Sequence, residues 1–140
     1  ILEALHGRDD VRSYLLTGNT RAGARAKLTH YGIFHFFPDG AFAEDPAPRS
    51  SIAVRALERA RQNAAVDPDR VFVIGDTPHD IECANAIAAR TIAVATGGYR
   101  LDELEAHRPW RVCAELPALE SFLSIIGTTD VPSGARTSGR

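Results

Sequence analysis

Residues 71–80 read VFVIGDTPHD, an apolar run that ends in a glycine and an aspartate. Residues 71–74 are apolar on both faces, as is typical of strands in parallel sheets that carry helices on either side. Gly75 and Pro78 indicate a turn, and apolar residues then recur at helical spacing. This stretch therefore predicts a buried parallel strand that ends in an acidic loop and leads into a helix.

The same alternation of strand and helix continues in both directions along the chain. The strands are expected at residues 11–16, 33–37, 40–42, 71–74, 91–95 and 111–113, and the helices at 20–31, 50–65, 78–89, 101–106 and 117–126. Such alternation predicts an α/β fold with a mainly parallel sheet. We place this domain at residues 1–126, and the Gly-, Ser- and Arg-rich residues 127–140 are expected to form a disordered tail.

Composition narrows the class of protein. With 140 residues, 44% of them hydrophobic and 24% charged, the chain can form one domain with a core. The formal net charge of -2 argues against nucleic acid or an anionic membrane as main partner.

No apolar run reaches the roughly 18 residues of a membrane span. Without a signal peptide or a metal-type cysteine spacing, we expect a cytoplasmic protein. The chain contains no methionine, so we expect a fragment of a longer or processed protein.

Two carboxylates follow the apolar run at 71–74. Asp76 comes directly after Gly75, and Asp80 lies four residues further on, in the first turn of the expected helix. Converging carboxylates repel each other unless a cation lies between them, and hard oxygen ligands suit Mg²⁺. Thr77 and Asp80 also have the spacing of a capping box. Asp76 is therefore a predicted metal ligand, whereas for Asp80 metal binding and helix capping both stay open.

A hydroxyl-bearing turn, Thr17-Gly18-Asn19, follows the expected strand at 11–16. Ligands of parallel sheets bind beyond the carboxyl ends of the strands, so this turn and the acidic loop are expected to be neighbours. A hydroxyl and backbone N–H groups before a helix form a natural anion site. Such a turn is also common as a plain helix cap, and the residues alone leave both interpretations open.

Taken in order, these motifs resemble those of the haloacid dehalogenase-like (HAD-like) hydrolases, in particular members similar to phosphoglycolate phosphatase. Residues 14–19, YLLTGN, match the family's hydroxyl motif, and residues 74–81, IGDTPHDI, match its GDxxxD motif. Residues 93–99, AVATGGY, resemble the strand and turn that come next. The family usually has a lysine followed by proline between these motifs; here the best-placed basic residue is Arg49, and Lys27 is a weaker candidate. The resemblance covers the C-terminal part of the family's sequence.

The resemblance implies a three-layer, Rossmann-like parallel sheet and Mg²⁺-dependent hydrolysis of a small phosphorylated metabolite through an aspartyl-phosphate intermediate. It implies Mg²⁺ binding by Asp76 and Asp80. It further implies phosphate binding by Thr17, Gly18, Asn19 and Arg49. Within this set Thr17, Arg49 and Asp76 are the implied catalytic residues.

The chain departs from the family in one major respect. The family's nucleophile is the first aspartate of a DxD motif after an apolar strand, and residues 67–69, DPD, precede a strand instead of following one. We therefore expect an incomplete sheet that lacks the nucleophile strand and the cap segment. A non-catalytic or truncated module is the main alternative to a phosphatase. A haloacid dehalogenase, which would not need Mg²⁺, is the second alternative.

Overall fold

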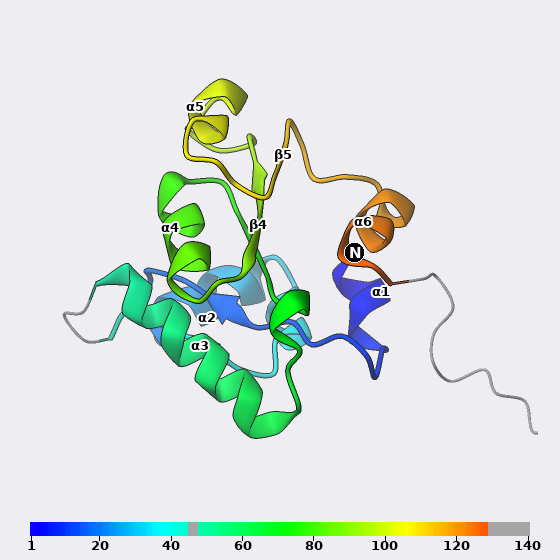
Figure 1. The fold of residues 1–140 in the computed structure, drawn as a ribbon. Helices are drawn as coiled ribbons and strands as arrows, with labels where there is room; N and C mark the ends of the chain where they lie inside the picture. Colours follow the sequence, from blue (N-terminus) through cyan, green and yellow to red (C-terminus); the bar gives the residue numbers. More distant parts are fainter. Residues whose placement is uncertain (45–47, 129–140) are drawn as a thin grey trace, which may run out of the picture.

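The computed structural model describes residues 1–44 and 48–128, and it forms two parallel sheets (Figure 1). The strands are β1 (Leu15–Leu16), β2 (Gly40–Ala41), β3 (Phe72–Gly75), β4 (Arg90–Val94) and β5 (Arg111–Cys113). The helices are α1 (Leu2–His6), α2 (Arg21–His30), α3 (Arg49–Asn63), α4 (Pro78–Ala86), α5 (Leu101–Glu105) and α6 (Leu119–Ile126), with 3₁₀ helices η1 (Phe34–Phe36) and η2 (Pro68–Arg70). The predicted α/β fold with parallel strands is confirmed.

Strand order follows the chain in each sheet. β1 pairs with β2, with Leu15 opposite Gly40, and β4 lies between β3 and β5. In the larger sheet Gly75 is opposite Ala93, so β3 and β4 end side by side. Parallel pairing brings the carboxyl ends of neighbouring strands to one edge of the sheet. The loops that follow β3 and β4 are therefore neighbours.

Helices cover both faces of the larger sheet, with α1 and α6 together on one side and α4 and α5 on the other (Figure 1). Alternate residues of β4 supply the two cores. The first core contains Leu5, Ile92, Val94, Phe122, Leu123 and Ile126, and the second contains Ile81, Ala93 and Leu104. Burial on both faces explains the continuous apolar character of β4. The expected three-layer architecture is present around this sheet.

Helix packing, and not a hydrogen-bond ladder, connects the two sheets. α3 contacts β1, β2 and α4, while α4 contacts β3 and β4. In the part of the chain that the structure describes, no strand pairing joins β1 to β3. Ile74, within β3, is 46% exposed although it belongs to the apolar run that predicted a fully buried strand. The sheet is incomplete between β1 and β3, as expected from the sequence.

The aromatic stretch at residues 33–37 does not form the predicted strand; residues 34–36 form η1 instead. η1 contacts α1 and α2, and the His6 ring lies 5.4 Å from that of Phe36. Aromatic propensity for strands was outweighed by this packing against two helices, one of which, α1, has no clear signal in the sequence. The first strand is also shorter than predicted, since only Leu15 and Leu16 pair with β2.

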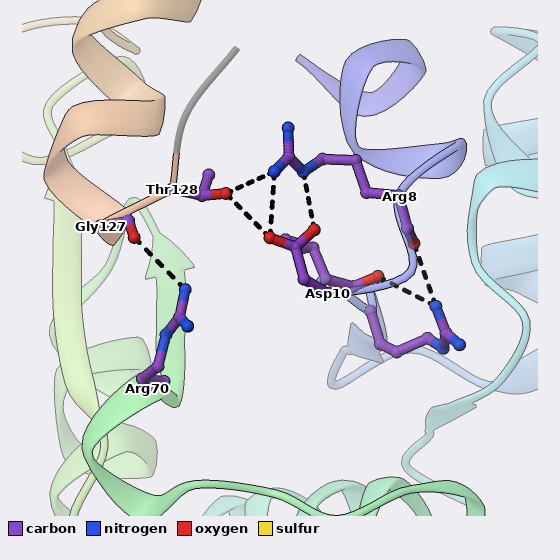
Figure 2. A network of polar contacts seen from close by, with 7 residues as sticks. Arg8, Asp10, Arg70, Gly127 and Thr128 are labelled. Atoms are coloured by element: carbon purple, nitrogen blue, oxygen red, sulfur yellow. Dashed lines mark hydrogen bonds and ion pairs between the residues drawn. The ribbon is translucent and has the colours of Figure 1, made fainter. Parts of the chain in front are cut away.

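A polar cluster that we call the terminal clasp joins the segment after α1 to the end of α6 (Figure 2). The buried Arg8 guanidinium donates to both carboxylate oxygens of Asp10, at 2.8 and 3.0 Å, and to Thr128 Oγ1 at 2.7 Å. The Thr128 hydroxyl in turn donates to Asp10 at 3.0 Å. The hydrogen bonds from Arg8 lower the pKa of Asp10 to about 2, against the opposing effect of burial.

The end of the described chain adjoins the predicted tail. Gly127 ends α6 with a φ of 72°, a left-handed conformation that glycine adopts at little cost. Residues 129–140 of the predicted disordered tail lie outside the described residues, so the domain boundary at residue 126 stays a prediction. No helix in the described part of the chain has the length and apolar character needed to cross a bilayer.

Candidate functional site

The carboxyl ends of β1 and β3 open onto one polar cleft of about 470 Å³. The residues that line it are Leu16, Thr17, Gly18, Asn19, Asp76, Thr77 and Asp80. The structure therefore brings together the two loops that the sequence analysis selected independently. A neighbouring cavity of about 520 Å³ between α2 and β2 is lined by other residues, among them Arg21, Phe34 and Phe42, and shares none with the cleft.

The carboxylates of Asp76 and Asp80 differ in their hydrogen bonding. Asp80 Oδ2 accepts two hydrogen bonds from Thr77, one from the backbone N–H at 3.0 Å and one from the hydroxyl at 2.8 Å. This is the predicted capping box at the start of α4. Asp76 is exposed, and its carboxylate has no hydrogen-bond or ion-pair partner within the described residues. Its carboxylate oxygens are therefore available to a ligand.

Each carboxylate lies against a glycine. A Cβ atom on Gly75 would overlap the carboxyl group of Asp80, and a Cβ atom on Gly97, in the loop after β4, would overlap the carboxyl group of Asp76. Gly75 precedes Asp76 in the motif, whereas Gly97 is distant in sequence and was not among the predicted site residues. Two signals pointed to Gly97: it belongs to the turn at 93–99 that resembles the family's next motif, and it follows the strand next to β3, at the same edge of the sheet.

On the opposite wall, Thr17 Oγ1 accepts a hydrogen bond from the Asn19 N–H at 3.1 Å. The Thr17 hydroxyl can therefore donate its proton to a ligand, while the backbone N–H of Asn19 already donates to Thr17. The Gly18 N–H has no hydrogen-bond partner in the described residues. Asn19 Oδ1 accepts from the Thr20 N–H at 2.8 Å, and Thr20 caps α2. This wall offers one hydroxyl donor and one backbone donor ahead of a helix N-terminus.

No cationic side chain lines the cleft within the described residues. Arg49 is the first residue of α3, but its side chain lies outside the described part, so its predicted role stays a prediction. Lys27 lies in the last turn of α2 and does not line the cleft. The described side chains therefore give the cleft a negative charge.

Two carboxylates are the possible metal ligands here, because no group of three histidine, cysteine, aspartate or glutamate side chains that could hold a metal occurs in the described ranges. Such a set does not suit Zn²⁺, which takes at least three protein ligands. Mg²⁺ keeps several waters and needs only one or two protein carboxylates. The chemistry of Asp76 and Asp80 thus fits Mg²⁺.

Comparison with known proteins identifies relatives of this chain. Residues 47–119 match the sequence model of the HAD-hydrolase-like family. A 5'-nucleotidase of Pseudomonas aeruginosa is 30% identical over 125 residues, which cover 88% of this chain and 55% of the relative.

Solved structures share the fold. A provisionally assigned phosphatase from Clostridium difficile matches with a TM-score of 0.76 and 21% identity, covering 89% of this chain and 56% of that protein. A haloacid dehalogenase-like hydrolase from Streptococcus pneumoniae matches with a TM-score of 0.71 and 20% identity, covering 90% and 55%. The chain therefore spans about half the length of the proteins that it resembles.

Proposed function

The chain belongs to the HAD-hydrolase-like family, and from that membership we propose that its protein is a Mg²⁺-dependent phosphomonoester hydrolase. The observation that supports this best is the single cleft with two carboxylates on one wall and free donors on the other. Carboxylates attract a cation, and hydroxyl and N–H donors bind an anion. A cleft with both is suited to a metal ion together with a phosphoryl group.

Electrostatics supports the need for a metal. Two unit charges of like sign 4 Å apart repel by about 4 kcal/mol at the effective dielectric constant near a protein surface. A phosphoryl dianion in this cleft would meet the charges of Asp76 and Asp80. Its binding therefore requires a counter-charge between the anions. Bound at Asp76 and Asp80, Mg²⁺ would supply this charge and shield the phosphoryl group for attack by an anionic nucleophile.

The protein's own groups take the remaining roles. The Thr17 hydroxyl proton and the Gly18 N–H bind a phosphoryl oxygen, and both are free of other partners in the described residues. Asn19 supports this loop through its hydrogen bond to Thr17. Arg49, at the start of α3, neutralises negative charge as attack proceeds, since arginine can bind phosphate in a bidentate manner.

The nucleophile is an aspartate supplied by polypeptide outside this sequence. Its carboxylate attacks phosphorus, the bond to the ester oxygen breaks, and a general acid from the same outside polypeptide protonates the leaving alkoxide to give the alcohol. Water then hydrolyses the aspartyl-phosphate to the free carboxylate and inorganic phosphate. Within residues 1–44 and 48–128, one edge of β1 and one edge of β3 are unpaired and flank the cleft, and a strand bearing the aspartate would pair there.

The substrate is a small phosphorylated metabolite in the cytoplasm. Nucleoside 5'-monophosphates are the first substrates to test, because a 5'-nucleotidase is among the relatives of this chain. Neither nucleic acid polymers nor membranes are proposed as partners.

Hydrolysis of p-nitrophenyl phosphate tests the proposal. The protein of the full reading frame should turn over the substrate with Mg²⁺ and stop when EDTA is added, whereas residues 1–140 alone should show no turnover. Asp76→Asn in the full-length protein should abolish the Mg²⁺-dependent rate. Asp69→Asn is the matched control, because Asp69 is an exposed carboxylate on η2, outside the cleft. Normal activity of Asp76→Asn would remove the metal assignment.

A non-catalytic module is the second candidate. It is favoured by one observation, the lack of a third carboxylate lining the cleft within the described residues. Under this alternative the full-length protein binds inorganic phosphate and Mg²⁺ but releases no phosphate from any ester. Dehalogenation of 2-haloacids without Mg²⁺ would instead identify the third candidate.

A further inference from the structure

We infer that Gly97 is a positioning residue for Asp76: its lack of a side chain leaves the space in which the Asp76 carboxylate lies at the cleft. This inference rests on the proposed function, in which Asp76 binds Mg²⁺. Gly97 itself touches neither metal nor substrate in this scheme.

The contact follows from the pairing of β3 with β4. Gly75 and Ala93 are opposite each other, so the chain leaves both strands at the same edge of the sheet. Asp76 follows directly after Gly75, and Gly97 is four residues beyond Ala93. A Cβ atom on Gly97 would overlap Asp76 Oδ2 and would lie 2.9 Å from Cγ and 3.3 Å from Cβ of the same side chain. All three of its nearest neighbours belong to Asp76.

Space, and not backbone conformation, is what position 97 requires. The φ angle of Gly97 lies outside the left-handed region, so alanine could adopt the same backbone. Asp76 has no hydrogen-bond partner in the described residues, and the backbone at Gly97 is a surface against which its carboxylate lies. An added methyl group would displace this carboxylate, because the end of a flexible side chain moves more easily than two paired strands.

Gly98 provides a matched control. A Cβ atom there would have no neighbour within 4 Å, and the φ angle of Gly98 also lies outside the left-handed region. The two substitutions, Gly97→Ala and Gly98→Ala, therefore change adjacent residues in the same loop by the same methyl group. They differ in whether that group meets Asp76.

The experiment compares wild type, Gly97→Ala, Gly98→Ala and Asp76→Asn in the full-length protein, without substrate. Calorimetric titration with MgCl₂ gives the metal affinity, and thermal unfolding in EDTA gives the stability. We expect Gly97→Ala to lose about 10- to 100-fold in Mg²⁺ affinity, the range typical of groups that orient a metal ligand. Its melting temperature in EDTA should stay close to the wild-type value. Gly98→Ala should keep both the affinity and the melting temperature.

The outcomes separate this inference from the proposed function. If Asp76→Asn binds Mg²⁺ like wild type, the metal assignment is wrong and the inference falls with it. If Asp76→Asn loses binding while Gly97→Ala keeps it, only the inference is overturned. A Gly97→Ala protein that no longer folds would also overturn it, because position 97 would then serve the fold. A crystal structure of Gly97→Ala provides a readout without metal: we expect a displaced Asp76 carboxylate, and an unmoved one contradicts the inference.

Discussion

Asp10→Asn should destabilise the protein by removing the charge that faces a buried guanidinium in the terminal clasp (Figure 2). The Arg8 side chain is only 5% exposed, and it donates to both oxygens of the Asp10 carboxylate. An asparagine keeps one acceptor oxygen but carries no charge and places an NH₂ group where the second acceptor was. The guanidinium then loses its ionic partner Asp10 while it stays buried.

The expected loss is about 1–2 kcal/mol in the free energy of unfolding at neutral pH. The lowering of the Asp10 pKa from 3.8 to about 2 corresponds to roughly 2 kcal/mol if fully expressed. The Asp10 side chain is 38% exposed, so solvent screening reduces this contribution to about 1 kcal/mol. Incomplete hydrogen bonding of the buried Arg8 adds up to about 1 kcal/mol.

The pH dependence follows from the direction of the shift. Because the pKa of Asp10 is lower in the folded protein, its stabilisation is complete above 3.8 and disappears as the pH falls through about 2. Urea unfolding of wild type and Asp10→Asn should therefore differ equally at pH 7 and pH 5, and the difference should shrink between about pH 4 and 2. Asp9→Asn, an exposed neighbour outside the clasp, is the control. Equal urea midpoints at pH 7, or a difference that persists to pH 2, would refute this account of the clasp.

Two further substitutions test the packing and capping described above. Thr77→Val should lower the free energy of unfolding by about 1 kcal/mol, because it removes the 2.8 Å hydrogen bond to Asp80. Thr77→Ser keeps the hydroxyl and should retain this hydrogen bond. Equal urea midpoints for the valine and serine variants would contradict the capping role of Thr77. Phe122→Ala should lower the free energy of unfolding by about 3–5 kcal/mol, since Phe122 is 2% exposed in the core under α6. A melting temperature that changes by only a degree or two would show that this core is not as well packed as the structure indicates.

Where capping and turn residues determine the local structure, the sequence alone was sufficient to predict it. The capping box of Thr77 and Asp80 and the glycine before Asp76 define the strand, turn and helix within a few residues, and this unit was predicted correctly. Tertiary packing decides the segment at 33–37, where His6 and α2 provide a surface for the aromatic side chains. No local pattern contains that information, so the strand predicted there was wrong.

The site shows the same division. Sequence order and parallel-sheet geometry were enough to bring Thr17 and Asp76 to one cleft. The contact between Gly97 and Asp76 depends on the register of β3 against β4, which the sequence does not specify residue by residue. The engagement of the Asn19 amide by Thr17 likewise depends on the conformation of one turn. The sequence thus predicted which loops line the cleft, but not which of their donors and acceptors are already hydrogen-bonded.

The link between the sheets has a mechanical consequence for the cleft. Thr17 and Asp76 follow strands that share no ladder in the described residues, so the span between them depends on how closely α3 and α4 approach. Ala53 on α3 and Ala84 on α4 are both fully buried, and such small side chains allow two helices to lie near each other. A larger side chain at either position would displace the atoms packed around it. The distance between Thr17 and Asp76 therefore depends on buried packing between helices that lies outside the cleft.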